Sequence, residues 1–355
     1  MARRIRSGGR SVALIGAALL VAAAVCSPAA AQDAGDYGHL VDVYAAGHLN
    51  EAVSVLARWP RENVTAAVRG ITRISQQSGP VVPARLRAAA MLHTDLAAAV
   101  LNSDGDLSGF HLGLARGLVN LLAAKKETVT GAHEFVKRWY EFVPTLYLVT
   151  RNFERASLLL REGLAQSPAD PMLYFYSGVI FEVAGAPPAT VVVRGGGINQ
   201  VVRPEKQLEA AANTYRRALA LDDRLAVVRL HLGWIHFQQH DSRARVDLEK
   251  ALADATDAST QYLAHLFLGA VAEREQRLAD ALLECEEART IGPQYQTAYV
   301  AISRIAEALG DTERARQAAL AFVGIEKRED PWWDYHLGGL NLPALEWLRA
   351  AAHGL

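Results

Sequence analysis

Apolar side chains recur every three or four positions along most of the chain, which is the period of a helix with one buried face. In the first half of the chain the stretches that show this period are residues 64–76, 84–100 and 110–123. Turn-forming pairs such as Asp104-Gly105 and Gly310-Asp311 separate stretches of this kind. The pattern therefore predicts an all-α chain in which successive helices are joined by short turns.

From about residue 137 onward the helical pattern itself repeats, with a period of about 34 residues. Leu232-Gly233 returns as Leu268-Gly269, and Ala281 returns as Ala315. Small residues at matching places let two helix backbones approach closely, so we expect antiparallel helix pairs stacked on one another. The small residues concerned are Gly178, Gly233 and Gly269 on first helices, and Ala156, Ala211, Ala244, Ala281 and Ala315 on second helices.

The order and spacing of these residues resemble those of tetratricopeptide repeats. Residues 151–156, followed by Gly163 and Pro168, are similar to the second half of such a repeat. Ser177-Gly178 and Phe181 then stand where the family's next first helix carries its small and aromatic residues. The resemblance implies an α-solenoid, a superhelix of antiparallel helix pairs, that acts as a non-enzymatic scaffold or adaptor for a protein partner.

The repeats are expected at residues 137–170, 171–225, 226–258, 262–295 and 296–328, with a weaker one at 37–62. Three residues depart from the family pattern. Asp223 replaces a helix-ending proline, Ser303 replaces a glycine, and Pro144 stands inside a first helix, which we expect it to kink or restart. The division expected for the chain is a signal peptide at 1–31, irregular helical repeats at 32–136, the array at 137–328, and at 329–355 a cap over the last repeat's apolar face.

The N-terminal segment has the pattern of a secretory signal. A basic stretch from Arg3 to Arg10 precedes the apolar run 12–25, and Ala31 ends a small-residue stretch suited to cleavage. An apolar helix of that length rises about 21 Å, less than the roughly 30 Å of a membrane core, so a cleaved signal fits better than a retained anchor. We expect the mature protein outside the cytoplasm, in the bacterial periplasm or secreted, without a stable membrane anchor.

One repeat is longer than the others. The extra residues lie at 186–206, where the β-prone runs 190–194 and 198–203 surround Gly195, Gly196 and Gly197 and predict a short hairpin. The hairpin either contributes to recognition or is an excursion tolerated at the edge of the array, and the sequence leaves both possibilities open.

Composition and motifs exclude several classes of function. The formal net charge is −1 and the pI about 6.8, so no basic field points to nucleic acid. The chain has no phosphate-binding loop, nucleophile elbow or Cys-x-x-Cys pair, so we expect no enzymatic activity and no cofactor. His236 and His240 lie one helical turn apart but lack a third ligand, so no metal site is expected. Cys285 is expected to be a buried structural thiol.

In the family that the chain resembles, first helices line a concave surface. The resemblance therefore implies an aromatic-lined groove for a protein or peptide partner, formed by Phe175, Tyr176, Val179, Leu230, His231, Trp234, Phe237, Leu266, Phe267, Arg274 and Arg304. Aromatic and arginine side chains often anchor protein interfaces, and the apolar lining favours a hydrophobic segment or helix as ligand. Two alternatives stay open. In the first, some of these side chains serve to pack helices together and do not line a groove. In the second, the array binds a small ligand or glycan as an accessory or sensor protein of the cell envelope.

Overall fold

The structure is a computed structural model that describes residues 37–74, 81–124, 130–185, 204–325, 330–335 and 340–353. The expected signal peptide at 1–31 and residues 186–203 of the insertion lie outside the described residues. Every regular element of the described residues is a helix, and none of them is a β-strand, which confirms the predicted all-α class. No described helix combines the length and the apolar character needed to cross a membrane.

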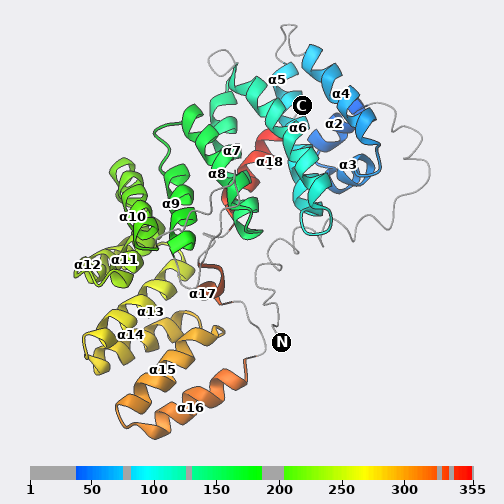
Figure 1. The fold of residues 1–355 in the computed structure, drawn as a ribbon. Helices are drawn as coiled ribbons and strands as arrows, with labels where there is room; N and C mark the ends of the chain where they lie inside the picture. Colours follow the sequence, from blue (N-terminus) through cyan, green and yellow to red (C-terminus); the bar gives the residue numbers. More distant parts are fainter. Residues whose placement is uncertain are drawn as a thin grey trace, which may run out of the picture. The chain divides into compact units, whose positions relative to one another are not determined.

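The helices follow one another along the chain in the colour order of Figure 1. Their bounds are α2 (Tyr37–Ala45), α3 (Leu49–Leu56), α4 (Arg61–Ile74), α5 (Val81–Val100), α6 (Gly105–Ala123), α7 (Ala132–Val149), α8 (Phe153–Gln166), α9 (Pro171–Gly185), α10 (Pro204–Leu221), α11 (Ala226–Gln238), α12 (Arg243–Asp254), α13 (Ala258–Arg274), α14 (Leu278–Ile291), α15 (Gln296–Ala308), α16 (Thr312–Val323), α17 (Pro331–Asp334) and α18 (Leu342–Ala352).

The chain divides into two compact units. Unit 1 comprises Met1–Pro168 together with Gly339–Leu355, and unit 2 comprises Ala169–Gly338. The chain therefore leaves unit 1 once and returns to it at its C-terminal end. Unit 1 is discontinuous in sequence, whereas unit 2 is a single continuous stretch.

In unit 1 the last helix packs against helices from much earlier in the chain. α18 contacts α5 and α7, as Figure 1 shows. Leu345 and Leu348 of α18 are buried, and so are Trp139 and Phe142 of α7, the helix that α18 contacts. The sequence predicts the C-terminal region as a cap on the last repeat, but its last helix instead belongs to unit 1 and packs there. The apolar face of α18 is buried there, against helices of unit 1 and not against the last repeat.

Unit 2 consists of the consecutive helix pairs α9/α10, α11/α12, α13/α14 and α15/α16, and each pair contacts the next (Figure 1). The predicted close approach within pairs is confirmed. A Cβ atom on Gly178 would lie 2.3 Å from the Tyr215 ring, and one on Gly233 would lie 2.8 Å from Leu248. At the matching place in the last pair, the hydroxyl of Ser303 donates to the carbonyl of Ala315, so a serine fits where the other pairs use glycine.

The turns inside the pairs share one backbone device. Gly47, Arg151, His240, Gln276 and Gly310 all adopt positive φ, and each follows the first helix of its pair. The amide of the residue that comes next donates to a carbonyl five positions earlier, as in the Schellman motif that ends helices. A left-handed residue thus closes the first helix in at least five pairs, and at three of these places the residue is not glycine.

Two single-residue expectations have clear outcomes. Helix α7 does not restart at Pro144, because it continues unbroken from Ala132 to Val149 with Pro144 buried inside it. Cys285 is buried, at 1% exposure, and its sulfur would lie 2.9 Å from a Cβ atom on Gly269. The prediction of a structural thiol at a helix contact is confirmed.

Candidate functional site

The residues that the sequence assigned to a groove lie on α9, α11, α13 and α15, the first helices of the four pairs of unit 2. We call the surface that carries them the first-helix face. Its buried members are Phe175, Tyr176, Val179, Leu230, His231, Leu266 and Phe267. Trp234 and Phe237 are half-buried, whereas Arg274 and Arg304 are exposed. The role of this set in binding a partner stays a prediction.

Residues 330–335 of the chain itself lie against this face, beginning with Asp330. The Asp330 carboxylate accepts a hydrogen bond of 3.1 Å from the hydroxyl of Tyr262 and one of 2.7 Å from the backbone amide of Thr297. Thr297 is in the first turn of α15, where amides lack helical acceptors and a negative charge is favourable. The other carboxylate oxygen accepts from the amide of Trp332 and caps α17. Asp330 thus fastens the segment to α13 and α15.

Trp332 adds an aromatic contact in the middle of the segment. Its ring meets Trp234 of α11 and Phe267 of α13 edge-on, with centroid distances of 5.6 Å in both cases. Trp234 also stacks on Phe267 at 4.2 Å and on Phe237 at 4.7 Å. Edge-to-face and offset contacts of this kind are the favoured geometries of aromatic pairs. The indole therefore completes a continuous aromatic cluster on the first-helix face.

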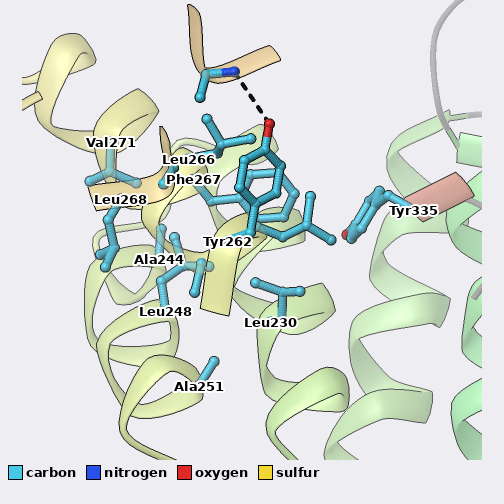
Figure 2. Close-up of a cluster of buried hydrophobic side chains, with 14 residues drawn as sticks. Leu230, Ala244, Leu248, Ala251, Tyr262, Leu266, Phe267, Leu268, Val271 and Tyr335 are labelled. Carbon is cyan, nitrogen blue, oxygen red and sulfur yellow. Dashed lines mark hydrogen bonds between the residues drawn. The ribbon is translucent and has the colours of Figure 1, made fainter. Parts of the chain in front are cut away.

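Tyr335 ends the segment in a buried part of the face. Its ring stacks on His231 at 4.3 Å and meets Phe267 edge-on at 5.2 Å. Figure 2 shows Tyr335 among the buried side chains of one cluster, together with Leu230 and Phe267. The Tyr335 hydroxyl donates a hydrogen bond of 2.7 Å to Glu182 of α9. The segment consequently contacts residues of α9, α11, α13 and α15.

Glu182 is the centre of a buried polar network. Its carboxylate also accepts from the hydroxyl of Tyr215 at 2.6 Å and lies 2.8 Å from Nδ1 of His231. Burial by itself would raise the pKa of Glu182, but the His231 charge and the hydrogen bonds from His231, Tyr215 and Tyr335 hold that pKa below its usual value. The network satisfies a carboxylate that is only 2% exposed.

The two tyrosines of the network are held as hydrogen-bond donors. Burial first, and then the charge of Glu182, raise the pKa of Tyr215 and of Tyr335 well above the usual value. Both hydroxyls therefore keep their protons over the physiological pH range. The network is a structural anchor for Tyr335, because its four side chains are buried and hydrogen-bond to one another.

Beyond Trp234 the first-helix face continues into exposed charged residues. The guanidinium of Arg274 lies 3.2 Å from the centroid of the Phe237 ring and donates to the Phe237 carbonyl. Such cation–π contacts are attractive, and Trp234 stacks on the same ring. Arg304 forms an ion pair with Glu273. This end of the face offers an aromatic ring framed by both signs of charge.

The sequence placed His231, Trp234 and Phe267 on one surface, and the structure brings them together. The sequence pattern did not identify Asp330, Trp332 or Tyr335 as residues of the same surface. The available signal was local: an Asp-Pro helix start followed by aromatic side chains three positions apart on one turn. That pattern predicts a short amphipathic turn but does not say which surface the turn covers.

Unit 1 contains a second polar site. A cleft of about 400 Å³ is lined by residues that include Arg116, Asn120, Tyr140 and Glu162. Arg116 and Glu162 form an ion pair, and the Tyr140 hydroxyl donates to Asn120 at 3.1 Å. The charged groups of the cleft are thus paired with each other. Across the described residues, no group of three or more His, Cys, Asp or Glu side chains is placed to hold a metal ion.

Comparisons with known proteins give similarities to solved structures only. No protein-family model and no curated protein matches the chain. PilF of Pseudomonas aeruginosa is 20% identical over 56% of this chain and 79% of its own, with a TM-score of 0.46. MamA is 18% identical over 52% of this chain and 94% of its own, with a TM-score of 0.40. YrrB, a TPR protein with an unusual peptide-binding site, is 14% identical over 57% of this chain and 90% of its own, with a TM-score of 0.38. The chain resembles tetratricopeptide repeat proteins of this kind.

Proposed function

We propose that this protein is a non-enzymatic scaffold or adaptor whose first-helix face binds a peptide segment of a protein partner in a concave, aromatic-lined groove. The observation that carries the proposal is that this face already holds a peptide segment, residues 330–335 of its own chain. It does so with an acid held by a backbone amide, an indole among aromatic rings and a phenol hydrogen-bonded to a buried carboxylate. A surface that can satisfy these three groups has the chemistry of a peptide-binding site.

The exposed end of the face offers further contact area to a partner. Phe237 and Trp234 remain half-buried, and Arg274 and Arg304 are exposed beside them. Aromatic and arginine side chains supply most of the binding energy in protein interfaces because they bury a large apolar area and retain a polar group. These four residues are therefore the part of the face that a partner reaches first.

We place this activity outside the cytoplasm, in the bacterial periplasm or secreted. The support is the basic stretch, apolar run and small-residue end of the N-terminal sequence. Mass spectrometry of the protein recovered from its native source measures where the mature chain begins. A mature N-terminus close to Gln32 is the expected result, whereas a protein that retains Met1 or the apolar run would contradict the placement.

The binding proposal is tested with an immobilised chain and an envelope extract of the source organism. Wild type is compared with a variant that carries Trp234→Ala and Phe237→Ala. The control variant carries Val246→Ala and Leu283→Ala, which change equally apolar but exposed positions on the second helices α12 and α14. A polypeptide retained by wild type and control, and lost from the groove variant, is the expected outcome.

The retained polypeptide is then purified and titrated against the same three chains by calorimetry. We expect the groove variant to bind at least about tenfold more weakly, because truncation of two interface aromatics costs more than about 1.4 kcal/mol. Equal affinities for all three chains would refute the groove. An unchanged polypeptide profile, together with loss of a bound glycan or small molecule from the groove variant, would instead favour the ligand-binding alternative.

A further inference from the structure

The 330–335 segment contacts the first-helix face as a short ligand would. Asp330 and Tyr335 are 2% and 4% exposed, although they lie at the two ends of a segment that contains only one short helix. Their hydrogen-bond partners Thr297, Tyr262 and Glu182 come from three different helix pairs. Among the described helices, α17 contacts α13, whereas α9, α11, α13 and α15 each pair with the second helix that follows.

Three anchor groups define the chemistry of this segment. An acidic side chain comes first, at Asp330. An indole follows two positions later, at Trp332, and a phenol three positions after that, at Tyr335. The turn of α17 brings the two rings to one side, where they stack with centroids 6.1 Å apart. Any peptide with an acid, an aromatic ring and a tyrosine at this spacing presents the same groups.

The face supplies complementary groups for each anchor. The free amide end of α15 and the hydroxyl of Tyr262 receive the acid. The rings of Trp234 and Phe267 receive the indole. The carboxylate of Glu182 receives the phenol. Because each of these groups is already engaged, a second peptide with the same anchors cannot bind until the segment leaves.

Covalent attachment makes the segment a strong competitor. A ligand tethered within the same chain acts at an effective concentration of the order of millimolar. A partner peptide of comparable intrinsic affinity therefore meets a face that is mostly filled, and its apparent affinity falls by the ratio of closed to open molecules. Loss of the Trp332 and Tyr335 anchors would remove this competition and leave the complementary groups of the face in place.

We propose that residues 330–335 are an internal ligand that closes the first-helix face, and that the partner is a polypeptide which displaces them with a segment carrying an acid, an aromatic ring and a tyrosine at the same spacing. This inference rests on the proposed function, since it names the chemistry of the ligand at the same face. It adds that the protein exists in a closed form and that partner binding opens it.

The test uses the full chain and a fluorescein-labelled synthetic peptide with the sequence of residues 329–336. The opened variant carries Trp332→Ala and Tyr335→Ala. The control variant carries Trp347→Ala, which removes a partly exposed tryptophan from α18 of unit 1. We expect the opened variant to bind the peptide at least about tenfold more tightly than wild type and control. A peptide with alanine at the positions of Trp332 and Tyr335 should bind none of the three chains.

A second measurement does not depend on the fold of a variant. Hydrogen exchange of wild type at a saturating concentration of the unlabelled peptide should speed up at the amide of Trp332, which is bonded to Asp330 in the closed form. The amide of Thr297 should stay protected, because the acid of the added peptide replaces Asp330. Unchanged exchange at Trp332, with tight peptide binding elsewhere, would overturn the proposal.

The outcomes separate this inference from the proposed function. A partner retained equally by wild type and opened variant, and unaffected by the peptide, would overturn the internal ligand while the groove remains supported by the Trp234 and Phe237 variant. Concentration-dependent dimers of wild type that the peptide dissociates would also overturn it, because the segment would then fill the face of a second copy. Release of the retained partner from wild type by the peptide would support it.

Discussion

The hydroxyl of Tyr335 donates a hydrogen bond of 2.7 Å to the carboxylate of Glu182, across a separation of 153 positions in the chain. Glu182 lies on the first helix of unit 2, and Tyr335 follows the last helix of that unit. The bond therefore links the two ends of the unit in sequence. Because both groups are buried, the bond contributes to stability as well as to the position of the segment.

Removal of this donor should weaken unit 2. The change Tyr335→Phe keeps the ring on His231 but leaves Glu182 one hydrogen bond short. Hydrogen bonds to charged groups contribute about 1.5–3 kcal/mol, so we expect amides of α9 and α11 to lose protection equivalent to that range. Native-state hydrogen exchange measures the loss helix by helix.

A matched change is available at Tyr299, whose hydroxyl donates to the carbonyl of Pro293 at an exposed site. Tyr299→Phe should change the free energy of unfolding by less than about 0.5 kcal/mol. Equal effects of the two substitutions would show that the Glu182 network adds nothing beyond a surface hydrogen bond.

The close approach of α9 and α10 should not tolerate a methyl group. In Gly178→Ala the new Cβ atom would lie 2.3 Å from the Tyr215 ring. The ring, whose hydroxyl donates to Glu182, would therefore have to shift. Overpacking of this kind costs about 1–3 kcal/mol, and we expect a lower melting temperature by circular dichroism. Gly113→Ala in α6 meets no atom within 4 Å and should raise the melting temperature slightly. A higher melting temperature for Gly178→Ala would contradict the packing of this pair.

The C-terminal helix should depend on one buried ion pair. Arg349 of α18 donates to the carboxylate of Asp95, which is fully buried and also accepts from the Tyr44 hydroxyl at 2.6 Å. Arg349→Ala leaves that carboxylate without its charge partner, which typically costs about 3–5 kcal/mol. Urea denaturation measures the loss. The exposed pair of Arg85 and Asp42 is the control, since Arg85→Ala should cost no more than about 1 kcal/mol.

Acid should destabilise unit 1 through a pair of buried imidazoles. The Nδ1 atoms of His93 and His111 lie 2.8 Å apart, and His93 Nε2 lies 2.8 Å from the hydroxyl of Tyr37. Burial, followed by the nearby charge of Arg61, lowers the pKa of His111 to about 4. Burial, followed by the charge of His111, lowers the pKa of His93 well below its usual value.

The direction of the pH dependence follows from these pKa values. Between about pH 6.5 and pH 4 the unfolded chain binds protons that the folded chain refuses, so the free energy of unfolding falls as the pH is lowered. Protonation of His111 alone lowers the free energy of unfolding by up to about 3 kcal/mol when the pH reaches about 4. Urea denaturation at pH 7.5, 6 and 5 should show the decrease, and His111→Asn should reduce its slope. Greater stability at pH 5 than at pH 7.5 would contradict the neutral pair.

The helix pairs could be predicted because their signal is local and repeats. Gly233 and Gly269 recur with nearly the period of one repeat, and the need for close backbone approach explains both residues. A restart at Pro144 does not occur, because the proline removes only one helical hydrogen bond while α7 is buried along most of its length.

The surface that holds residues 330–335 could be predicted only in part. The resemblance to tetratricopeptide repeats put His231 and Trp234 on one surface, and that surface is where the segment lies. The pairing of Glu182 with Tyr335 has no local signature, because a buried acid and a distant tyrosine carry no spacing that joins them. The same holds for Arg349 and Asp95, which are 254 positions apart.

The return of the chain to unit 1 constrains the order in which the protein can assemble. A ribosome delivers the N-terminal end first, yet the surfaces of α5 and α7 that α18 contacts stay uncovered until that helix arrives. Unit 2, a continuous stretch, emerges in full before that helix does. The N-terminal unit is therefore the last to be completed, and its uncovered apolar surface before that point is a natural target for a chaperone.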